Sequence, residues 1–353
     1  MAKKLICGIQ QIGIGVSDVE NAWAWYRKFF GMDVPVFQDA GEAPLMVDYT
    51  GGSVHARTAT LAMNLIGGGG FEIWQFTSRE GIPPGFEVQL GDFGIFAAKI
   101  KSPDVKKAFD AFNEMGPGQK LALEKDPAGS ETFFIRDPFG NIFQIVEGKD
   151  WFQKGPYPTG GPAGCIIGVS DIDKARTVYS EILGYDSVVY DKEGAFADFA
   201  VIPGGDKKFR RVLLTHSEPR KGSFSKIFGT SFIELVSVQN RKPKKIFQDR
   251  YWGDLGFIHL CFDVKGMDAI EAQCRSRGTP FTVDSKDAFD MGQASGRFSY
   301  IEDPDGTLIE FVEANKVPIM KNLGWYLNVG KKDPEKQIPD WMIKMLKFSR
   351  KKD

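Results

Sequence analysis

The sequence is poor in the residues that build thiolate sites and disulfides. Its 353 residues contain four cysteines, Cys7, Cys165, Cys261 and Cys274, and no two of them form a CxxC pair. Such isolated cysteines argue against a zinc–thiolate site and against a disulfide framework. We therefore expect all four to be reduced and to fill space in the core.

The chain also lacks an excess of charge and a long apolar run. Lysine and arginine number 45 against 46 aspartates and glutamates, a formal net charge of −1, which provides no basic stripe for nucleic acid. The N-terminal segment MAKKLICGIQ has only a short apolar stretch, so it is neither a secretory signal nor a membrane span. These absences predict a cytoplasmic protein with no nucleic-acid and no membrane partner. The expected partners are a small-molecule substrate or ligand and, as one option, a second copy in a homodimer.

What the sequence does contain is an internal repeat. The segment IGIGVSDVENAWAWYRKFFG (12–31) returns as CIIGVSDIDKARTVYSEILG (165–184), and more distant copies lie at 93–116 and 257–278. Each copy has the pattern of a strand, a Ser or Asp helix cap, an amphipathic helix and a glycine stop. Short β-rich runs follow each helix. The sequence therefore predicts a βαβββ module four times, with a Gly/Pro-rich linker at 151–164 between the two halves.

The strand–helix opening and the turns DPFGN and DPDGT recur in βαβββ order across nearly all of residues 7–315. In this the chain resembles the vicinal oxygen chelate superfamily, which includes glyoxalase I, methylmalonyl-CoA epimerase, extradiol dioxygenases and bleomycin-resistance proteins. The resemblance implies an α+β fold in which four βαβββ modules form two tandem glyoxalase-like half-barrel domains. We expect a domain without a metal site at 7–149, a domain with a candidate metal site at 160–315, and a C-terminal helical extension at 316–353.

The strands that follow the two DPxG turns differ at their centres. RDPFGNIFQIVE (136–147) carries Gln144, whereas EDPDGTLIEFVE (302–313) carries Glu310 between two apolar residues. An ionised carboxylate in such a strand is costly unless a cation or a hydrogen-bond donor meets it. This difference predicts that the second half holds the chemical site.

The resemblance places metal ligands on the first and last strands of each module. In the first half these positions carry Gln11, Glu72, Ile95 and Gln144, and in the second half Gly164, Glu234, His259 and Glu310. Strand alternation independently puts His259 and Glu310 opposite the apolar faces of their strands. We expect His259, Glu310 and Glu234 to be metal ligands that converge in one cleft of the second half, with Gly164 leaving a fourth position open.

Three residues are candidate catalytic groups. Glu234 is either a ligand or a general base whose pKa apolar neighbours raise. His216 is a metal ligand or proton shuttle, or else a strand-end histidine that faces solvent. Tyr300 directs its phenol at an oxyanion, or else belongs to the core. The third histidine, His55, is expected to be structural or on the surface.

Imidazole and carboxylate ligands suit a divalent ion such as iron, manganese, nickel, cobalt or zinc. The sequence thus predicts a metal-dependent lyase, isomerase or ring-cleaving dioxygenase that acts on an oxygen-rich small molecule. The alternative is a non-catalytic binding or resistance protein of the same fold, whose cleft sequesters an apolar ligand. Metal content distinguishes the two.

The C-terminal segment contains a predicted helix from Pro339. Trp341, Met342, Met345 and Leu346 share one side of it. We expect this helix to pack on its own domain; the alternatives are a lid over the second-half cleft and an anchor at a membrane surface.

Overall fold

The computed structural model describes residues 4–286, 289–290, 295–320, 325–330 and 333–351, and these contain the four predicted βαβββ modules. Module 1 has β1 (Leu5–Gly15), α1 (Val19–Phe30), β2 (Val34–Glu42), β3 (Ala56–Met63) and β4 (Gly70–Phe76). Module 2 has β5 (Gly94–Ser102), α2 (Val105–Met115), β6 (Glu124–Lys125), β7 (Glu131–Arg136) and β8 (Ile142–Glu147). Module 3 has β9 (Pro162–Gly168), α3 (Ile172–Arg176), β10 (Ser187–Gly194), β11 (Phe209–Thr215) and β12 (Phe232–Val238). Module 4 has β13 (Gly256–Lys265), α5 (Met267–Ser276), β14 (Val283–Asp284), β16 (Ser295–Glu302) and β17 (Leu308–Met320).

Shorter elements join or extend the modules. They are 3-10 helices at Pro44–Tyr49, Ala197–Phe199 and Met345–Ser349, a π-helix at Thr177–Ile182, α4 (Ser225–Phe228), β15 (Phe289–Asp290), β18 (Trp325–Asn328) and α6 (Asp340–Lys344). None of the helices in the described part of the chain has the length and apolar character needed to span a bilayer.

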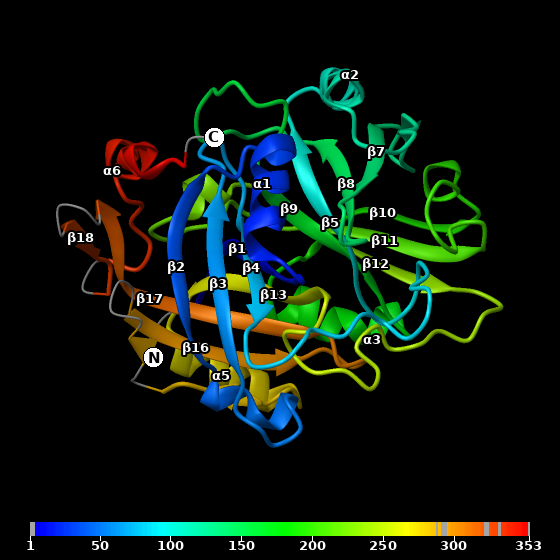
Figure 1. The fold of residues 1–353 in the computed structure, drawn as a ribbon. Coiled ribbons are helices and arrows are strands. Elements are labelled where there is room, and N and C mark those ends of the chain that lie inside the picture. The colour runs from blue at the N-terminus through cyan, green and yellow to red at the C-terminus, as the bar shows by residue number, and fades with distance from the viewer. Residues whose placement is uncertain (1–3, 287–288, 291–294, 321–324, 331–332, 352–353) are drawn as a thin grey trace.

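The strands form two curled sheets of the half-barrel kind (Figure 1). The first sheet has the order β14-β16-β17-β13-β1-β4-β3-β2, and the second has the order β10-β11-β12-β9-β5-β8-β7-β6. Module 4 therefore joins module 1 through the antiparallel pair β1–β13, and module 3 joins module 2 through the antiparallel pair β5–β9. Each sheet combines one module from residues 7–149 with one from residues 160–315. The two sheets therefore do not correspond to the two halves of the sequence that the linker at 151–164 separates.

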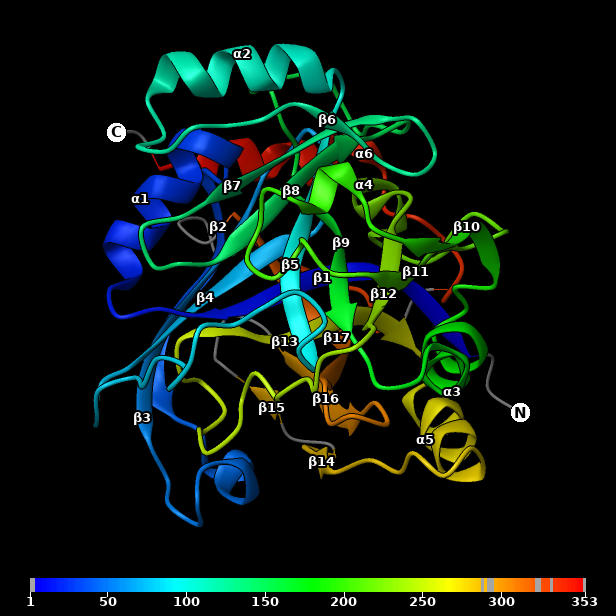
Figure 2. The ribbon, with the colours of Figure 1, turned by 90° about the vertical axis from the view of Figure 1, so that its right-hand side faces the viewer.

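The helices begin and end where the sequence predicts. Asp18 and Asp171 accept hydrogen bonds from backbone N–H groups in the first turns of α1 and α3. Gly31 ends α1 with φ of 60°, a conformation that favours glycine. The helices cover the outer faces of the sheets, and Figure 2 shows α3 beside α5. There Gln273 donates a hydrogen bond of 2.9 Å to the backbone oxygen of Glu181.

The largest apolar cluster takes residues from all four modules, including Ile12, Phe112, Leu235 and Phe311. All four cysteines are buried and free of disulfides, as expected. The two sheets therefore share one main core behind their concave faces.

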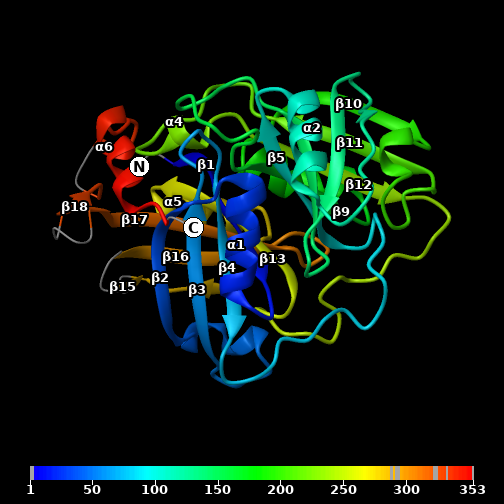
Figure 3. The ribbon, with the colours of Figure 1, turned by 45° about the horizontal axis from the view of Figure 1, so that its top comes forward.

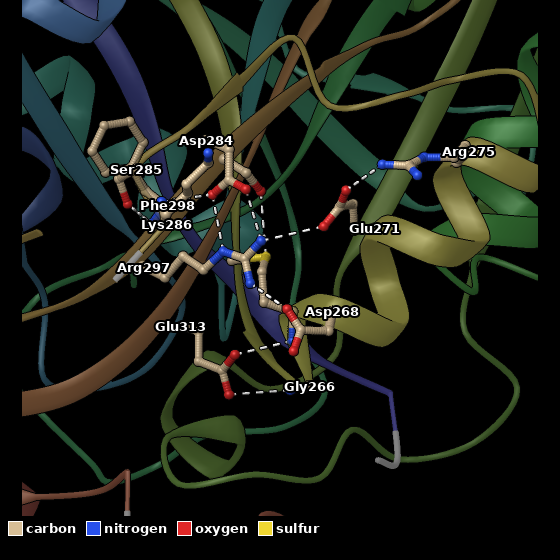
Figure 4. Close-up of polar contacts among 12 residues, drawn as sticks. Gly266, Asp268, Glu271, Arg275, Asp284, Ser285, Lys286, Arg297, Phe298 and Glu313 are labelled. Carbon is tan, nitrogen blue, oxygen red and sulfur yellow. Dashed lines mark hydrogen bonds and ion pairs between the residues drawn. The ribbon is translucent and has the colours of Figure 1, made fainter. Parts of the chain in front are cut away.

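Figure 4 shows how Arg297 of β16 ties α5 to the first sheet. Its guanidinium forms ion pairs with Asp268 and Glu271 of α5 and with Asp284 of β14. Glu313 of β17 accepts hydrogen bonds from the backbone N–H groups of Gly266 and Met267 at the start of the same helix. These contacts fix the strands that carry Tyr300 and Glu310.

The C-terminal segment packs on the first sheet, at the side away from the second sheet (Figure 3). Ile343 and Leu346 are buried in a cluster with residues of β2, β3 and α4. The backbone N–H of Ile338 donates to the oxygen of Ser223 at 3.0 Å. The helix is thus packed, but against β2 and β3 of the first half as well as against its own domain. Its buried side also differs from the one expected, because Trp341 is 54% exposed.

The two DPxG turns each receive a tyrosine from a helix of the preceding module. Tyr26 of α1 donates to Asp137 Oδ2 at 2.6 Å, and Tyr179 donates to Asp303 Oδ2 at 2.8 Å. Asp137 and Asp303 also accept backbone N–H groups inside their own turns. The recurrence of tyrosine at 26 and 179 thus has a physical cause: a buried carboxylate needs these donors.

Replacing Tyr26 by Phe should lower the free energy of unfolding by about 1.5–3 kcal/mol, because a buried carboxylate loses a charge-assisted hydrogen bond. Urea unfolding measures this change. Tyr49→Phe is the control, since the Tyr49 hydroxyl donates to the less buried Glu302. Equal losses in the two variants would contradict the role assigned to the turn.

Candidate metal centre

Four polar side chains from four adjacent strands meet on the concave face of the first sheet. They are Gln11 of β1, Glu72 of β4, His259 of β13 and Glu310 of β17. His259 Nε2 lies 3.1 Å from Glu310 Oε2 and 3.4 Å from Glu72 Oε2. Gln11 Nε2 lies 3.1 Å from Glu72 Oε2 and 3.5 Å from Glu310 Oε2. The group Glu72, His259 and Glu310 could hold a metal ion, since one ligand atom of each lies within 4.8 Å of the others.

The strand registers explain why these residues meet. Gly13 of β1 is the cross-strand partner of His259 on one side and of Glu72 on the other. A Cβ at Gly13 would lie 2.5 Å from His259 Cε1, so only glycine leaves room for the imidazole there. On β17, Glu310 is paired with Cys261, two residues after His259. The two carboxylates therefore come from strands on either side of the β1–β13 pair and meet at the same nitrogen of the imidazole, Nε2.

His259 is fully buried. Burial lowers the pKa of its imidazole, but Glu310 and Glu72 outweigh burial and raise that pKa to about 9. Two carboxylates with one imidazole between them thus create a site that favours positive charge.

The donor set fits a divalent cation. Donor atoms bound to one ion at about 2.1 Å lie roughly 3–3.4 Å apart, close to the separations at His259 Nε2. Among the described residues the buried Gln11 Oε1 has no hydrogen-bond partner, and His259 Nε2 lies near two carboxylates without a well-aligned hydrogen bond to either. An amide can also turn to present its oxygen instead of its nitrogen. A shared cation would satisfy both atoms.

Tyr300 of β16 stands next to this group. Its hydroxyl lies 3.5 Å from His259 Nδ1, and its backbone is paired with Glu310. Burial and the nearby Glu310 raise the pKa of the phenol well above its usual value, so Tyr300 stays neutral and can donate a hydrogen bond. Tyr300 is thus buried in an apolar cluster and contacts the histidine; its role toward an oxyanion stays a prediction.

A cavity of about 650 Å³ opens over the four residues, and Gln11, Glu72, Tyr300 and Glu310 are among its lining residues. Most of its other lining side chains are apolar, including Leu61, Met63, Trp74, Trp252, Phe298 and Val312. Sites that bind small molecules commonly have such a lining, with a few convergent polar groups.

The model of the Glyoxalase/Bleomycin resistance protein/Dioxygenase superfamily matches residues 8–145 and 162–311. The chain belongs to this superfamily. Glyoxalase I from Zea mays is 14% identical, with a TM-score of 0.52 over 88% of this chain and 92% of that one. A dioxygenase candidate from Bacillus subtilis is 16% identical, with a TM-score of 0.54 over 88% and 86%. At these identities the likeness shows a shared fold. No curated protein matches the chain.

Glu234 does not join the site with His259 and Glu310, and the expectation that the three converge is corrected. Glu234 lies on β12 of the second sheet, where Lys99 Nζ donates to its Oε2 at 2.6 Å. Arg211 Nε and the Tyr190 hydroxyl both donate to its Oε1, at 2.6 and 2.7 Å. The physical reason is the pairing of modules, because module 3 faces module 2 and leaves module 4 to module 1.

The second sheet has four adjacent strands, β8, β5, β9 and β12, that correspond to the strands β17, β13, β1 and β4 of the metal centre but carry other residues. We call each such set of four strands a frame. By register, Ile166 occupies the position of Gly13, and its partners Ala97 and Glu234 occupy those of His259 and Glu72. Ala97 is thus the counterpart of His259, where the sequence comparison had placed Ile95. Gly164 is the counterpart of Gln11, so it opens no position in the first sheet.

Lys99 supplies the positive charge in this second frame. It is paired with Gly164 on one side and with Gln144 on the other, and its ammonium group donates to Gln144 Oε1 as well as to Glu234. Lys99 and Glu234 are almost completely buried. The charge of Lys99 therefore balances the carboxylate of Glu234, which occupies in the second sheet the position that Glu72 occupies in the first.

His216 directly follows β11, the strand next to β12 in the second sheet, and does not belong to the first sheet. Its Nδ1 is 2.8 Å from the backbone oxygen of Glu218, and its Nε2 accepts the backbone N–H of Ser231 at 3.3 Å. Burial lowers the pKa of this imidazole. His216 is a neutral residue that holds a strand end, and the structure brings it to neither carboxylate of the metal centre. His55 is partly exposed and contacts Ser78.

The residues that the sequence expectation missed are Gln11 and Glu72. Both stood at ligand positions of the superfamily, but they were assigned to a half of the chain without a site. The sizes of the residues on the paired strands could have identified Gln11 and Glu72 as neighbours of His259. Gly13 leaves room for an imidazole on the next strand, whereas the larger Ile166 at the corresponding position does not.

Lys99→Met should lower the free energy of unfolding by about 3–5 kcal/mol, because it removes one partner from a buried ion pair. Denaturant unfolding measures the loss. Lys107→Met is the matched control, since Lys107 forms an exposed pair with Asp104, and it should change stability little. Similar behaviour of the two variants would show that Lys99 does not neutralise Glu234.

The Glu234 network should also make stability fall in acid. Burial raises the pKa of Glu234, but Arg211 and Lys99 outweigh burial and lower it from 4.5 to about 2. A depressed pKa stabilises the folded state above pH 4.5, and this stabilisation is lost as the pH falls towards 2. The stability gap between the wild type and Glu234→Gln should therefore narrow by on the order of 3 kcal/mol across this range. Urea unfolding at several pH values tests this, and a constant gap would contradict it.

Proposed function

We propose that the protein is a metal-dependent isomerase or lyase that acts on a small carbonyl compound with two neighbouring oxygens. The observation that carries this proposal is the convergence of Glu72, His259 and Glu310, with Gln11 beside them, at the wall of a cavity that Gln11, Glu72 and Glu310 line.

The donor set favours this reaction class over oxygen activation. Non-haem iron oxygenases typically use two histidines and one carboxylate, whereas this site offers one histidine, two carboxylates and an amide. Such an anionic, oxygen-rich set suits zinc, manganese, cobalt, nickel or iron used as a Lewis acid. When bound, the ion would polarise the substrate's oxygens and make the neighbouring C–H group more acidic.

The two carboxylates supply the proton transfer. Glu72 and Glu310 both lie close to His259 Nε2 and both line the cavity. One carboxylate takes the proton from the hydroxyl-bearing carbon next to the carbonyl, a proton is returned to the former carbonyl carbon, and the hydroxyl proton passes to the former carbonyl oxygen. The electron pair of the broken C–H bond shifts into the carbonyl and then into the new C–H bond, so no oxidant is required.

The other groups position the reaction. Gln11 on β1 adds an amide to the donor set. The Tyr300 hydroxyl contacts His259 Nδ1, the ring nitrogen that the carboxylates do not contact, and so orients the imidazole. The apolar walls exclude water and strengthen the electrostatic interactions inside the cavity.

Metal content tests the proposal. His259→Ala, Glu310→Gln and Glu72→Gln should each lower zinc and manganese affinity at least tenfold, as measured by calorimetry and elemental analysis of the purified protein. Glu234→Gln is the matched control, because it stands at the same strand position in the other sheet and should retain the metal. If all three site variants bind metal like the wild type, the cavity belongs to a non-catalytic binding protein instead.

Gly13→Ala should weaken metal binding without altering any ligand. The added methyl group would collide with the His259 ring, which must then move out of line with the carboxylates. Calorimetry should show at least a tenfold loss of affinity, while Gly41→Ala, whose Cβ would meet no atom within 4 Å, should bind metal normally. Unchanged affinity in Gly13→Ala would contradict the role given to His259.

A further inference from the structure

The cavity extends along the strands well beyond the four polar residues. On β17 the residues Glu310, Val312 and Ala314 share the face that lines it, and they lead towards the C-terminal segment. Four residues of strand span about 13 Å, the length of an extended chain of roughly eight carbons or more. The space next to the metal centre is therefore long as well as wide.

Apart from Lys316, the side chains of the described residues that line this end of the cavity are apolar. Its walls come from the first sheet, from α4 and from the C-terminal segment, and they consist of Met63, Val312, Ala314, Phe228, Ile343 and Leu346. Five of these residues are nonpolar side chains larger than alanine. A polar part of a substrate placed here would lose its bound water without gaining hydrogen-bond partners from the protein.

The charged residues that line the cavity outside the metal centre are Asp39, Glu42, Arg57 and Lys316. Arg57 and Asp39 form an ion pair of 2.6 Å, and Lys316 lies over the ring of Tyr326 at 4.2 Å. Glu42 is exposed. This arrangement offers no cationic cluster for a phosphorylated or otherwise multiply anionic substrate.

The apolar end is built in part by residues that the superfamily model does not reach, beside Met63 and Phe228, which it does reach. That match ends at residue 311, whereas Ile343 and Leu346 come from the segment after it. The segment is held in place by the backbone bond from Ile338 to Ser223 and by the ion pair between Lys226 and Asp340 at 2.6 Å. Substrate selection at this end is thus a property of this chain.

We propose, building on the isomerase or lyase function above, that the substrate joins its two-oxygen head to an extended apolar body, aliphatic or aromatic. The metal centre receives the head. The C-terminal segment, through Ile343 and Leu346, forms the wall that receives the body and sets its length.

Hydroxamates test this proposal, because they present two oxygens to a metal and can be made with long or short tails. Calorimetry with the zinc-loaded protein would compare octanohydroxamate, acetohydroxamate and octanamide, which keeps the tail but lacks the chelating head. Octanohydroxamate should bind at least thirtyfold more tightly than acetohydroxamate, because the longer tail buries several more methylene groups.

Variants separate the tail from the head. Ile343→Ser/Leu346→Ser should weaken octanohydroxamate at least fivefold and leave acetohydroxamate unchanged. Phe348→Ser is the control, because Phe348 is 63% exposed and does not line the cavity. Met63 lines the same end of the cavity from β3, so Met63→Ser should also weaken octanohydroxamate binding. This second variant keeps the test valid if the double variant displaces the C-terminal segment. His259→Ala should weaken both hydroxamates and leave octanamide unchanged.

The outcomes distinguish the two proposals. Equal affinity for the two hydroxamates would overturn the apolar-body inference while leaving the metal function standing. Octanamide binding as tightly as octanohydroxamate would overturn the metal function while leaving the apolar cavity standing. If neither the double variant nor Met63→Ser weakens octanohydroxamate, the body does not lie against the C-terminal segment and the proposal fails.

Discussion

The antiparallel pairing of β1 with β13 is the contact on which the candidate site depends. It joins the first and the last module of the chain, and it sets Gly13 opposite His259. Because β4 and β17 flank this pair, their carboxylates then meet at the imidazole. Were modules 1 and 2 to pair instead, Gln11 and Glu72 would face Ala97 and Gln144, and no imidazole would be present.

The two sheets show two solutions to one electrostatic problem. Each frame keeps a glutamate at the same position of the last strand of a module, Glu72 in one and Glu234 in the other, and a buried carboxylate requires positive charge nearby. In the second sheet Lys99 and Arg211 provide it, and the loop around Phe199 fills the concave face. In the first sheet the cationic partner is His259, held between two carboxylates, and the concave face stays open as a cavity.

Much of the fold could be predicted from the sequence, because the relevant signals are local. The repeat, the caps at Asp18 and Asp171, the glycine stops and the strand alternation each depend on neighbours a few residues away, and they gave the four modules correctly. Alternation also placed His259 and Glu310 on the cavity face. The choice of partner module is different in kind, since it depends on contacts between segments far apart in the sequence, such as Gly13 and His259, and no local pattern records it.

The same distinction explains the errors at the site. The sequence pattern marks Glu72 as a candidate ligand but groups it with residues of the first half instead of with His259. The same pattern groups Glu234 with His259, whereas in the structure Glu234 contacts Lys99. The assignment of Ile95 instead of Ala97 is a slip of two residues along one strand. The register of β5 is irregular between these two residues, so Ile95 lies in the main core whereas Ala97 lies in the cluster on the other face of the sheet. Regular alternation of side chains does not predict such a bulge.

The position of the apolar end of the cavity follows from the same long-range pairing. Once β17 lies beside β13 in the first sheet, its extension to Met320 carries the chain past the end of the superfamily repeat and across to β2. The following segment can then bury Ile343 and Leu346 against β3 and α4, which closes the cavity at a distance from the polar residues. The pairing that assembles the polar group therefore also fixes where the chain's own C-terminal residues close the cavity, so the polar group lies on the sheet and the apolar wall opposite it comes in part from the segment that follows the sheet.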